Sequence, residues 1–400
     1  MNTRLMVKGL VPESLKDLYK KLRKGFIRAE FKIFSLVPIK RNRVVFCNVW
    51  GFGDNPKWVA LALLDGKIRE KEDVGCEPEI VFITDTSRSE EIPDDIRVVK
   101  NNSPAAIFAL ATARVWLDCN RKEPYISKRK GQYYIQTWHG SLPLKKIERD
   151  AVTEFTEEYK KNARRDTDMT DLCISNGEFC NGIYRRAFGY NGRVFMCGSP
   201  RVDVLLRSVR NGEDELRVVY APTFRGDGRR IKAGEDAQPV LEALEQRFGR
   251  KVVPIKRLHP LSTTQAAKNG EKDGLSFKDS VDGNRFGDLY ELLSKADVLI
   301  TDYSNTMFEF ALTGRPVFLY APDYREYADS RGMYFEYESL PFPIATDVKE
   351  LAENILSYDE TVFINKQKEF FDKLKIIENG KAWNRRRALP GRIFRMTGSL

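Results

Sequence analysis

The sequence predicts a two-domain α/β protein in which each domain is built on a parallel β-sheet covered by helices. Short apolar runs with the length of buried strands alternate with helical patterns, which is typical of βαβ units. A chain of 400 residues has room for two or three domains, and a Gly-Ser-Pro-Arg break at residues 198–201 divides the alternation into two halves. We expect domains at 43–198 and 199–375. A basic amphipathic segment at 1–42 precedes them, and a basic tail at 376–400 follows that can return to the first domain.

The composition is that of a globular protein, with 42% hydrophobic and 31% charged residues. We find neither an uninterrupted apolar run long enough to span a membrane nor the apolar core of a secretory signal. The cysteines form no C-x-x-C pair, and we interpret them as buried apolar residues of a reducing compartment. They are Cys47, Cys76, Cys119, Cys173, Cys180 and Cys197.

The net charge of +10 favours an anionic partner, which can be a nucleic acid, a membrane surface or a phosphorylated substrate. Composition alone does not choose among these three. Basic residues concentrate in the first 43 residues and in the loops that carry motifs. They are not interleaved with exposed aromatic residues as an RNA-binding platform requires, so no nucleic-acid partner is expected.

Residues 14–37 alternate basic and apolar side chains at near-helical spacing, and this pattern has two interpretations. A basic amphipathic helix with aromatic residues can lie in the headgroup plane of an anionic membrane. It can instead pack on the core and leave a cationic face in solvent. The apolar residues expected on one face are Leu15, Leu18, Tyr19, Leu22, Phe26 and Ile27.

The first domain is predicted from runs of β-branched and aromatic residues that alternate with helical segments. The Gly-rich turn at 51–56 lacks the G-x-G-x-x-G spacing, so it is either a phosphate cradle or a structural turn, and Pro56 suits the first position of a helix. Strands are expected at 43–49, 80–84, 96–99, 114–118, 133–137, 171–175 and 193–197, and helices at 57–64, 105–113, 153–165 and 177–188.

The run at 133–137 ends in a Trp-His-Gly corner that a dibasic segment follows. We expect Gly140 to provide a sharp turn that presents His139 at the end of a strand. The chain has only two histidines, His139 and His259, and each ends a strand-like run, where α/β proteins place their chemistry. From position alone, His139 is either a base or a packed, hydrogen-bonded residue.

The second half repeats the alternation of strands and helices. Strands are expected at 216–220, 251–260, 297–300 and 316–320, and helices at 239–248, 288–296, 307–312 and 362–377. Three of these strands end in groups that can hold a nucleoside diphosphate. Ser304, Asn305 and Thr306 lie where a helix begins, and that position favours phosphate binding but equally favours simple capping of the helix.

The other two strand ends carry cationic or imidazole donors. Arg225 follows Ala-Pro-Thr, and Arg257 lies two residues before His259. Glu309 lies in the helix after Thr306, where it can reach a ribose diol or form a salt bridge beside the core.

These motifs resemble the CDP-glycerol glycerophosphotransferase family, which contains the teichoic-acid primases and polymerases and their capsule-synthesis relatives. The resemblance runs in matching order from about residue 44 to residue 345 and includes residues 53–57 and 315–332. The motifs that carry it are Trp138-His139-Gly140, Ala221-Pro222-Thr223-Phe224-Arg225, His259-Pro260 and Thr301-Asp302-Tyr303-Ser304.

The resemblance implies a GT-B fold, in which two Rossmann-like domains face each other across a cleft and the C-terminal one binds the donor. Members transfer glycerol phosphate from CDP-glycerol to a hydroxyl of a lipid-linked, undecaprenyl-type acceptor and release CMP. They act as peripheral proteins at the cytoplasmic face of the membrane, which favours the membrane interpretation of residues 14–37. The chain length fits a primase-like or short capsule-type enzyme better than a long polymerase.

By the same resemblance, His139 corresponds to the base and His259 to a second functional histidine near the donor phosphates. The residues implied in substrate binding are Trp138, Gly140, Ser141, Lys145, Thr223, Arg225, Arg257, Thr301, Asp302, Ser304, Asn305 and Glu309. Asn305 replaces a frequent serine and Glu309 an aspartate of several members. The loop at 141–145 also departs from the common pattern, which leaves the acceptor open.

Asp302 alone does not make a metal site, so we expect no tightly bound cofactor or metal, and a loosely required divalent cation stays open. Two related activities also stay open. A GT-B glycosyltransferase with a nucleotide-sugar donor can use the same phosphate contacts, and CDP-ribitol can replace CDP-glycerol as the donor.

Overall fold

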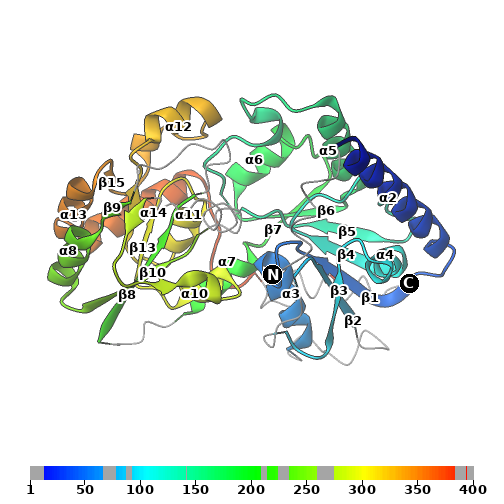
Figure 1. Cartoon of the computed structure of the whole chain (residues 1–400), viewed down its shortest axis with the longest axis horizontal. Coiled ribbons are helices and arrows are strands. Elements are labelled where there is room, and N and C mark those ends of the chain that lie inside the picture. The colour runs from blue at the N-terminus through cyan, green and yellow to red at the C-terminus, as the bar shows by residue number, and fades with distance from the viewer. Residues whose placement is uncertain are drawn as a thin grey trace.

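The computed structural model of the chain describes residues 13–65, 78–86, 92–140, 142–208, 214–223, 234–258, 274–382 and 393. These residues form two lobes that lie side by side (Figure 1). In the first lobe, the described strands form one parallel sheet of order β3-β2-β1-β4-β5-β6-β7. Its strands are β1 Lys40–Cys47, β2 Glu79–Thr84, β3 Ile96–Lys100, β4 Ala113–Asp118, β5 Tyr133–Gln136, β6 Leu172–Ser175 and β7 Arg193–Met196.

The second lobe is built on a parallel sheet of order β12-β10-β8-β13-β14-β15. Its strands are β8 Glu215–Ala221, β10 Lys251–Lys256, β12 Val281–Asp282, β13 Val298–Thr301, β14 Val317–Tyr320 and β15 Ile344–Ala345. The short strands β9 Glu235–Asp236 and β11 Leu275–Ser276 pair beside it. The predicted α/β class with two Rossmann-like domains is confirmed.

The strand order reverses at one point in each sheet, between β1 and β4 and between β8 and β13. In open parallel sheets, ligands bind beyond the carboxyl ends of the strands at such a reversal. The loops after these strands are therefore where a site is expected. They include the Gly-rich turn after β1 and the Pro222-Thr223 and Asp302–Ser304 segments after β8 and β13.

The helices of the first lobe are α2 Glu13–Phe34, α3 Asp54–Leu64, α4 Pro104–Thr112, α5 Glu157–Met169 and α6 Glu178–Arg186, with the 3-10 turn η2 Glu148–Asp150. Two of them begin more than one residue away from the predicted position. Helix α3 begins before Pro56, at Asp54. Helix α5 begins four residues later than predicted because the Thr156 side chain accepts a hydrogen bond from the Tyr159 amide and caps it there.

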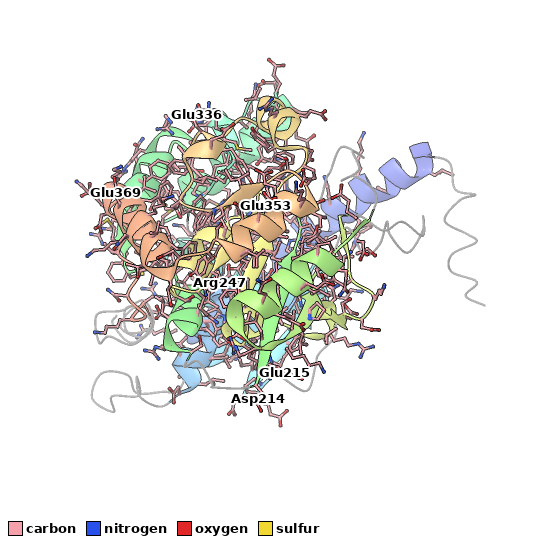
Figure 2. The ribbon with its side chains drawn as sticks, turned by 90° about the vertical axis from the view of Figure 1, so that its left-hand side faces the viewer. Asp214, Glu215, Arg247, Glu336, Glu353 and Glu369 are labelled. Carbon is pink, nitrogen blue, oxygen red and sulfur yellow. The ribbon has the colours of Figure 1, made fainter. Side chains whose placement is uncertain are left out.

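The helices that follow are α7 Pro200–Arg207, α8 Gln238–Phe248, α10 Leu289–Ser294, α11 Thr306–Ala311, α12 Tyr324–Arg331, α13 Val348–Leu356 and α14 Glu360–Lys373, with 3-10 turns at Gly283–Arg285 and Tyr337–Ser339. Helix α7 lies between the lobes (Figure 1). Helices α8 and α13 pack side by side, and Figure 2 labels Arg247 and Glu353 on them. Helix α14 ends earlier than predicted, at Lys373, because Lys375 takes a positive φ of 52°.

Helix α2 packs along the outer side of the first lobe beside α4 (Figure 1). Ile27 and Phe31 are buried there, and Phe34 meets Phe108 edge to face at 5.4 Å. The expectation of one common apolar face is therefore wrong for Ile27, which points to the core while other apolar residues are exposed. The exposed ones are Leu15, Leu22, Phe26, Ile33 and Leu36.

After α14 the chain contacts the first lobe. Ile376 forms an isolated antiparallel bridge with Gly177, and the Ile377 amide donates to the Asn176 carbonyl at 2.8 Å. Further along, Ile393 is fully buried in the first-lobe core with Val44. The C-terminal segment thus touches both lobes.

The Glu378 carboxyl group lies at this crossing and makes stability depend on pH. Burial raises its pKa from the usual 4.5 to about 8, although the Ser199 amide donates to both carboxyl oxygens. Below pH 4.5 the folded and unfolded chains both hold the proton. Between pH 4.5 and about 8, Glu378 loses its proton in the unfolded chain but keeps it in the folded chain. The free energy of unfolding therefore falls as the pH rises through this range.

We expect Glu378→Gln to gain stability relative to the wild type as the pH rises, by at most about 1.4 kcal/mol per pH unit in that window. Urea unfolding at about pH 5 and about pH 8.5 measures this difference. Glu336→Gln, at an exposed position of the second lobe (Figure 2), is the matched control and should show no such growth. The same pH dependence in wild type and Glu378→Gln would contradict this assignment.

Candidate functional site

The turn after β5 presents His139, and its unusual residue is Trp138. Trp138 has a positive φ of 53°, a left-handed conformation that bulky residues rarely adopt and that often marks functional sites. The Trp138 amide donates to Gln136 Oε1 at 2.8 Å, and the Thr137 hydroxyl donates to the Asp118 carbonyl at 3.2 Å. The sharp turn was expected at Gly140, but Gly140 is not left-handed. The need for glycine there is steric, because a Cβ would lie 2.7 Å from Asn305 Nδ2.

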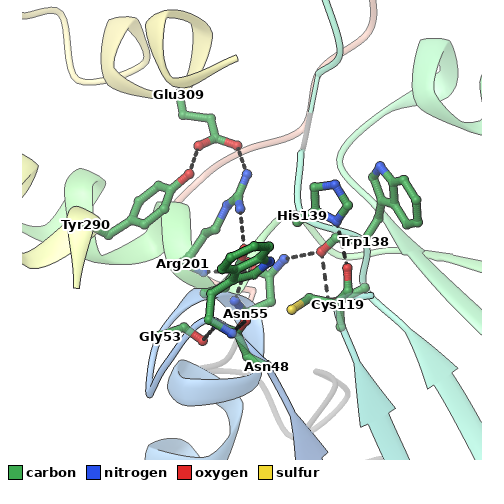
Figure 3. Close-up of polar contacts among 12 residues, drawn as sticks. Asn48, Gly53, Asn55, Cys119, Trp138, His139, Arg201, Tyr290 and Glu309 are labelled. Carbon is green, nitrogen blue, oxygen red and sulfur yellow. Dashed lines mark hydrogen bonds and ion pairs between the residues drawn. The ribbon is translucent and has the colours of Figure 1, made fainter. Parts of the chain in front are cut away.

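The His139 ring has a defined tautomer. It stacks on the Trp138 ring with centroids 4.3 Å apart, and its Nδ1 lies 2.8 Å from the Cys119 carbonyl oxygen (Figure 3). A carbonyl only accepts, so Nδ1 carries a proton, and in the neutral ring Nε2 keeps the lone pair. Desolvation by the surrounding protein lowers the pKa of His139 below its usual 6.5, while part of the residue stays open to solvent. The neutral ring therefore dominates at neutral pH.

Asp302 organises the carboxyl ends of β8 and β13. Its carboxylate accepts from the Thr223 amide at 2.8 Å and from the Tyr303 amide at 2.6 Å. The Thr301 hydroxyl donates to the Ala221 carbonyl at 2.7 Å. Thr301 and Asp302 are buried, whereas Thr223 is partly exposed. Buried Thr301 and Asp302 therefore shape the turns, and the hydroxyl oxygen of Thr223 is covered although the residue is partly exposed.

The Ser304 hydroxyl accepts from the Thr306 amide at 3.3 Å and donates to the Thr306 hydroxyl at 2.9 Å. The bond from the Thr306 amide supports the start of α11, in line with the capping interpretation of the motif, although the N-cap residue Asn305 makes no side-chain capping bond. The other interpretation, phosphate binding, is compatible with it because Ser304 and Asn305 are both partly exposed.

Of the remaining predicted site residues, Arg257 and Lys145 have their side chains bonded to neighbouring protein groups. Arg257 donates to the carbonyls of Gly283 and Phe286, and its burial lowers its pKa. Lys145 reaches the Tyr327 hydroxyl at 3.4 Å and lies over that ring. Ser141, Arg225 and His259 lie outside the described residues.

Glu309 is fully buried. One carboxylate oxygen pairs with Arg201 at 2.6 Å and the other accepts from the Tyr290 hydroxyl (Figure 3). The salt-bridge interpretation of Glu309 describes this arrangement, and a ribose diol could reach the carboxylate only if the residues that bury it moved apart.

The loop after His139 is hydrogen-bonded to the second lobe. The Leu144 amide donates to Asn305 Oδ1 at 2.9 Å, and the Tyr334 amide donates to the Leu144 carbonyl at 2.8 Å. The Lys146 amide donates to the Gly332 carbonyl at 3.0 Å. The structure thus brings the Trp-His-Gly corner and the Ser304–Asn305 turn together from opposite lobes.

Sequence reasoning missed Asp54 and Arg201 as parts of this region. Both stood in noted motifs. The Gly-rich turn was interpreted as a phosphate cradle or a structural turn and as part of the family resemblance, and the Gly-Ser-Pro-Arg break was interpreted as the domain boundary. Their ion pair at 2.9 Å joins residues 147 positions apart. A pairing of that separation leaves no signal in the local pattern.

Within the described residues, no group of histidine, cysteine and carboxylate side chains is arranged to hold a metal ion. In the same part of the chain, no helix is both long and apolar enough to cross a membrane.

Two Rossmann-like lobes, joined through a short helix and facing each other with the loops beyond their strands, define the GT-B class of transferases. The chain belongs to the CDP-glycerol:poly(glycerophosphate) glycerophosphotransferase family, whose profile matches residues 29–387. Both the predicted GT-B fold and the predicted family are thereby confirmed.

Several relatives are teichoic acid enzymes. The chain is 32% identical over 317 residues to a teichoic acid poly(glycerol phosphate) polymerase of Staphylococcus epidermidis, covering 73% of this chain and 43% of that protein. It is 28% identical over 380 residues to a polymerase of the same name from Bacillus spizizenii, covering 88% and 92%. A teichoic acid glycerol-phosphate transferase of Staphylococcus aureus is 28% identical over 407 residues, covering 93% and 98%. The chain thus spans less than half of the first relative and nearly all of the other two.

A similar solved structure is that of the wall teichoic acid polymerase TagF. It superposes with a TM-score of 0.76 at 26% identity, covering 96% of this chain and 98% of that chain.

We expect Gly140→Ala to destabilise the protein by about 1–2 kcal/mol, because the new methyl group displaces Asn305 and breaks its bond to the Leu144 amide. Asn305→Ser removes the obstructing amide. The double variant should therefore lose less stability than the sum of the two single variants. Urea unfolding of all four proteins measures the coupling, and strictly additive losses would contradict the contact.

Proposed function

We propose that the chain transfers glycerol phosphate from CDP-glycerol to a hydroxyl of a membrane lipid-linked acceptor in teichoic acid or capsule-type polymer synthesis and releases CMP. The family description supports the donor and the transferred group. A variant of the similar enzyme TagF has been soaked with CDPG. The observation that carries the proposal is the contact between the lobes, since Asn305 beside the candidate phosphate turn touches the His139 loop.

His139 acts as the general base in this proposal. Its Nε2 takes the proton of the acceptor hydroxyl, the oxygen attacks the phosphorus that bears glycerol, and the bond from that phosphorus to the CMP oxygen breaks. A positioned base contributes ~10²–10⁴-fold, so most of the acceleration comes from orientation and charge neutralisation. The bond from Nδ1 to Cys119 holds the ring in the tautomer that this role needs.

The donor diphosphate lies at the switch point of the second lobe in this proposal. Ser304 and Asn305 supply polar groups, Arg225, Arg257 and His259 supply positive charge or donors, and Asp302 holds the turns in place. The candidates with partly exposed side chains lie on loops around β8 and β13, where an open parallel sheet binds its ligand.

We expect His139→Ala to lower CMP release by ~10²–10⁴-fold while binding of CDP-glycerol is retained. In the wild type, kcat/KM should fall on the acid side with an apparent pKa below 6.5, because the base must be neutral and desolvation lowers the pKa of His139. Mass spectrometry of the products after parallel incubations with CDP-glycerol, CDP-ribitol and UDP-sugars, with and without EDTA, measures donor choice and metal need. Full activity of a folded His139→Ala variant would contradict the base assignment.

The exposed side of α2 is the membrane contact in this proposal. It carries large apolar residues together with basic ones, which suits an interface with anionic lipid. The basic residues on the described, exposed part of this helix are Lys21, Arg23, Lys24, Arg28 and Lys32.

We expect Leu22→Gln with Phe26→Gln to weaken binding to anionic vesicles by more than roughly 10-fold, since burying one such side chain is worth roughly 1.5–3 kcal/mol. Co-sedimentation with vesicles of anionic or purely zwitterionic lipid measures the loss. Val362→Gln, which changes another exposed apolar residue, on α14, is the control and should bind as the wild type does. Unchanged binding of the α2 variant would contradict the proposed surface.

A further inference from the structure

Arg201 lies in the first turn of α7, between the lobes, and is almost completely buried. Its Nη1 pairs with Asp54 of the first lobe at 2.9 Å, and its Nη2 pairs with Glu309 of the second lobe at 2.6 Å. The guanidinium also lies over the Tyr290 ring at 4.8 Å. One cation is therefore held between carboxylates of both lobes (Figure 3).

The same residue is bonded toward the His139 corner. The Arg201 amide donates to Asn55 Oδ1 at 3.2 Å, and Asn55 Nδ2 donates to the Trp138 carbonyl at 3.4 Å. Figure 3 shows Asn55 between Arg201 and the residues Trp138 and His139. A continuous series of contacts thus joins the strand end that carries His139 to Arg201.

On the other side, Glu309 belongs to α11, which begins directly after the Ser304–Asn305 turn. The position of Glu309 is fixed by two bonds, one from Arg201 and one from Tyr290. Because Arg201 belongs to α7 and Glu309 to α11, any movement of one helix relative to the other changes the geometry of the bond between them. The planar guanidinium with two donors at fixed geometry is suited to hold such a distance.

We propose that Arg201, given the transfer reaction proposed above, is a positioning residue that fixes the distance between His139 and the Ser304–Asn305 turn through Asp54 and Glu309. A buried ion pair is a weak source of net stability, because desolvation of its charges offsets their attraction. The two bonds of Arg201 do, however, form only at a defined distance and orientation of the partners. A reaction between groups on two lobes requires that the distance between those groups be fixed.

The charges that face His139 make the pH dependence of kcat/KM a test of this role. Asp54 from α3, Arg201 from α7 and Glu148 from η2 act on the ring, and Glu148 is itself paired with Arg121 at 2.9 Å. Desolvation is the largest influence and lowers the pKa of His139. Arg201 lowers that pKa further, whereas Asp54 and Glu148 raise it.

Substituting either partner of the Arg201–Asp54 ion pair therefore breaks the same contact but shifts the pKa of His139 in opposite directions. Arg201→Gln removes a positive charge, so the pKa of His139 rises and the acid limb of kcat/KM moves to higher pH. Asp54→Asn removes a negative charge, so the acid limb moves to lower pH. A merely structural role predicts no such opposition.

The experiment compares Arg201→Gln, Arg201→Lys and Asp54→Asn with a matched control. The control is Arg315→Gln, which changes an equally buried arginine that donates to the Leu293 and Ala296 carbonyls inside the second lobe. We expect kcat to fall ~10–100-fold in both Arg201 variants, with donor binding by calorimetry changed less than about threefold. Arg201→Lys keeps the charge and should keep the wild-type acid limb. Arg315→Gln should lose stability but keep the pH profile.

Hydrogen exchange provides a readout that does not need the reaction. The Lys146 and Tyr334 amides pair across the lobes. In Arg201→Gln or Arg201→Lys we expect them to exchange at least about 10-fold faster, but not in the control. If Arg201→Gln fails to fold, Arg201→Lys still tests the geometry through kcat and exchange, and Asp54→Asn still tests the shift of the acid limb to lower pH.

Unchanged kcat and unchanged exchange in folded Arg201 variants would overturn the inference. Wild-type protein that releases no CMP from CDP-glycerol would overturn the proposed function instead. In that case the exchange measurement still decides whether Arg201 sets the placement of the lobes.

Discussion

The guanidinium of Arg201 touches a carboxylate from each lobe, and the placement of the two lobes depends on this buried cluster. Removing one partner would leave a charge unpaired in a region that water does not freely reach, which is far more costly than losing one partner of an exposed pair. The neighbouring Lys57–Glu291 pair at 2.6 Å and the bond from the Asp54 amide to Asp288 cross the same boundary. Charge pairing therefore determines the alignment at this boundary.

The two sheets share one strand order and so place their functional loops at equivalent points. In the second lobe, the Asp302 carboxylate bridges the turns after β8 and β13 through backbone amides. In the first lobe, Asp118 at the end of β4 pairs with Lys122 at 2.7 Å, and the neighbouring Cys119 carbonyl orients His139. In each lobe a buried aspartate fixes the backbone beside the switch point. The aspartate itself needs no contact with a ligand, and it holds in place the partly exposed groups around it.

The sequence predicted the strands well because buried parallel strands are continuous apolar runs, as at Val44–Cys47. It predicted helix starts less well where a single side chain decides, as when Thr156 caps α5. It named Glu309 but left its partner open, and it missed Arg201 entirely as a contact. The Arg201–Glu309 bond joins residues 108 positions apart, and no local pattern can tell which of many carboxylates an arginine will meet.

Asn305 limits how the site can work. Its Oδ1 is bonded to the Leu144 amide and its Nδ2 lies against Gly140, so both ends of the amide are engaged with the first lobe. A serine at this position would be shorter and could not span this gap. A donor phosphate could bind Asn305 only through the Nδ2 hydrogens beside Gly140, because Oδ1 is an acceptor and is already bonded to the Leu144 amide. The residue thus links donor binding to the position of the His139 loop, and the partly exposed Ser304 hydroxyl is the better placed of the two to contact the diphosphate while the loop stays docked.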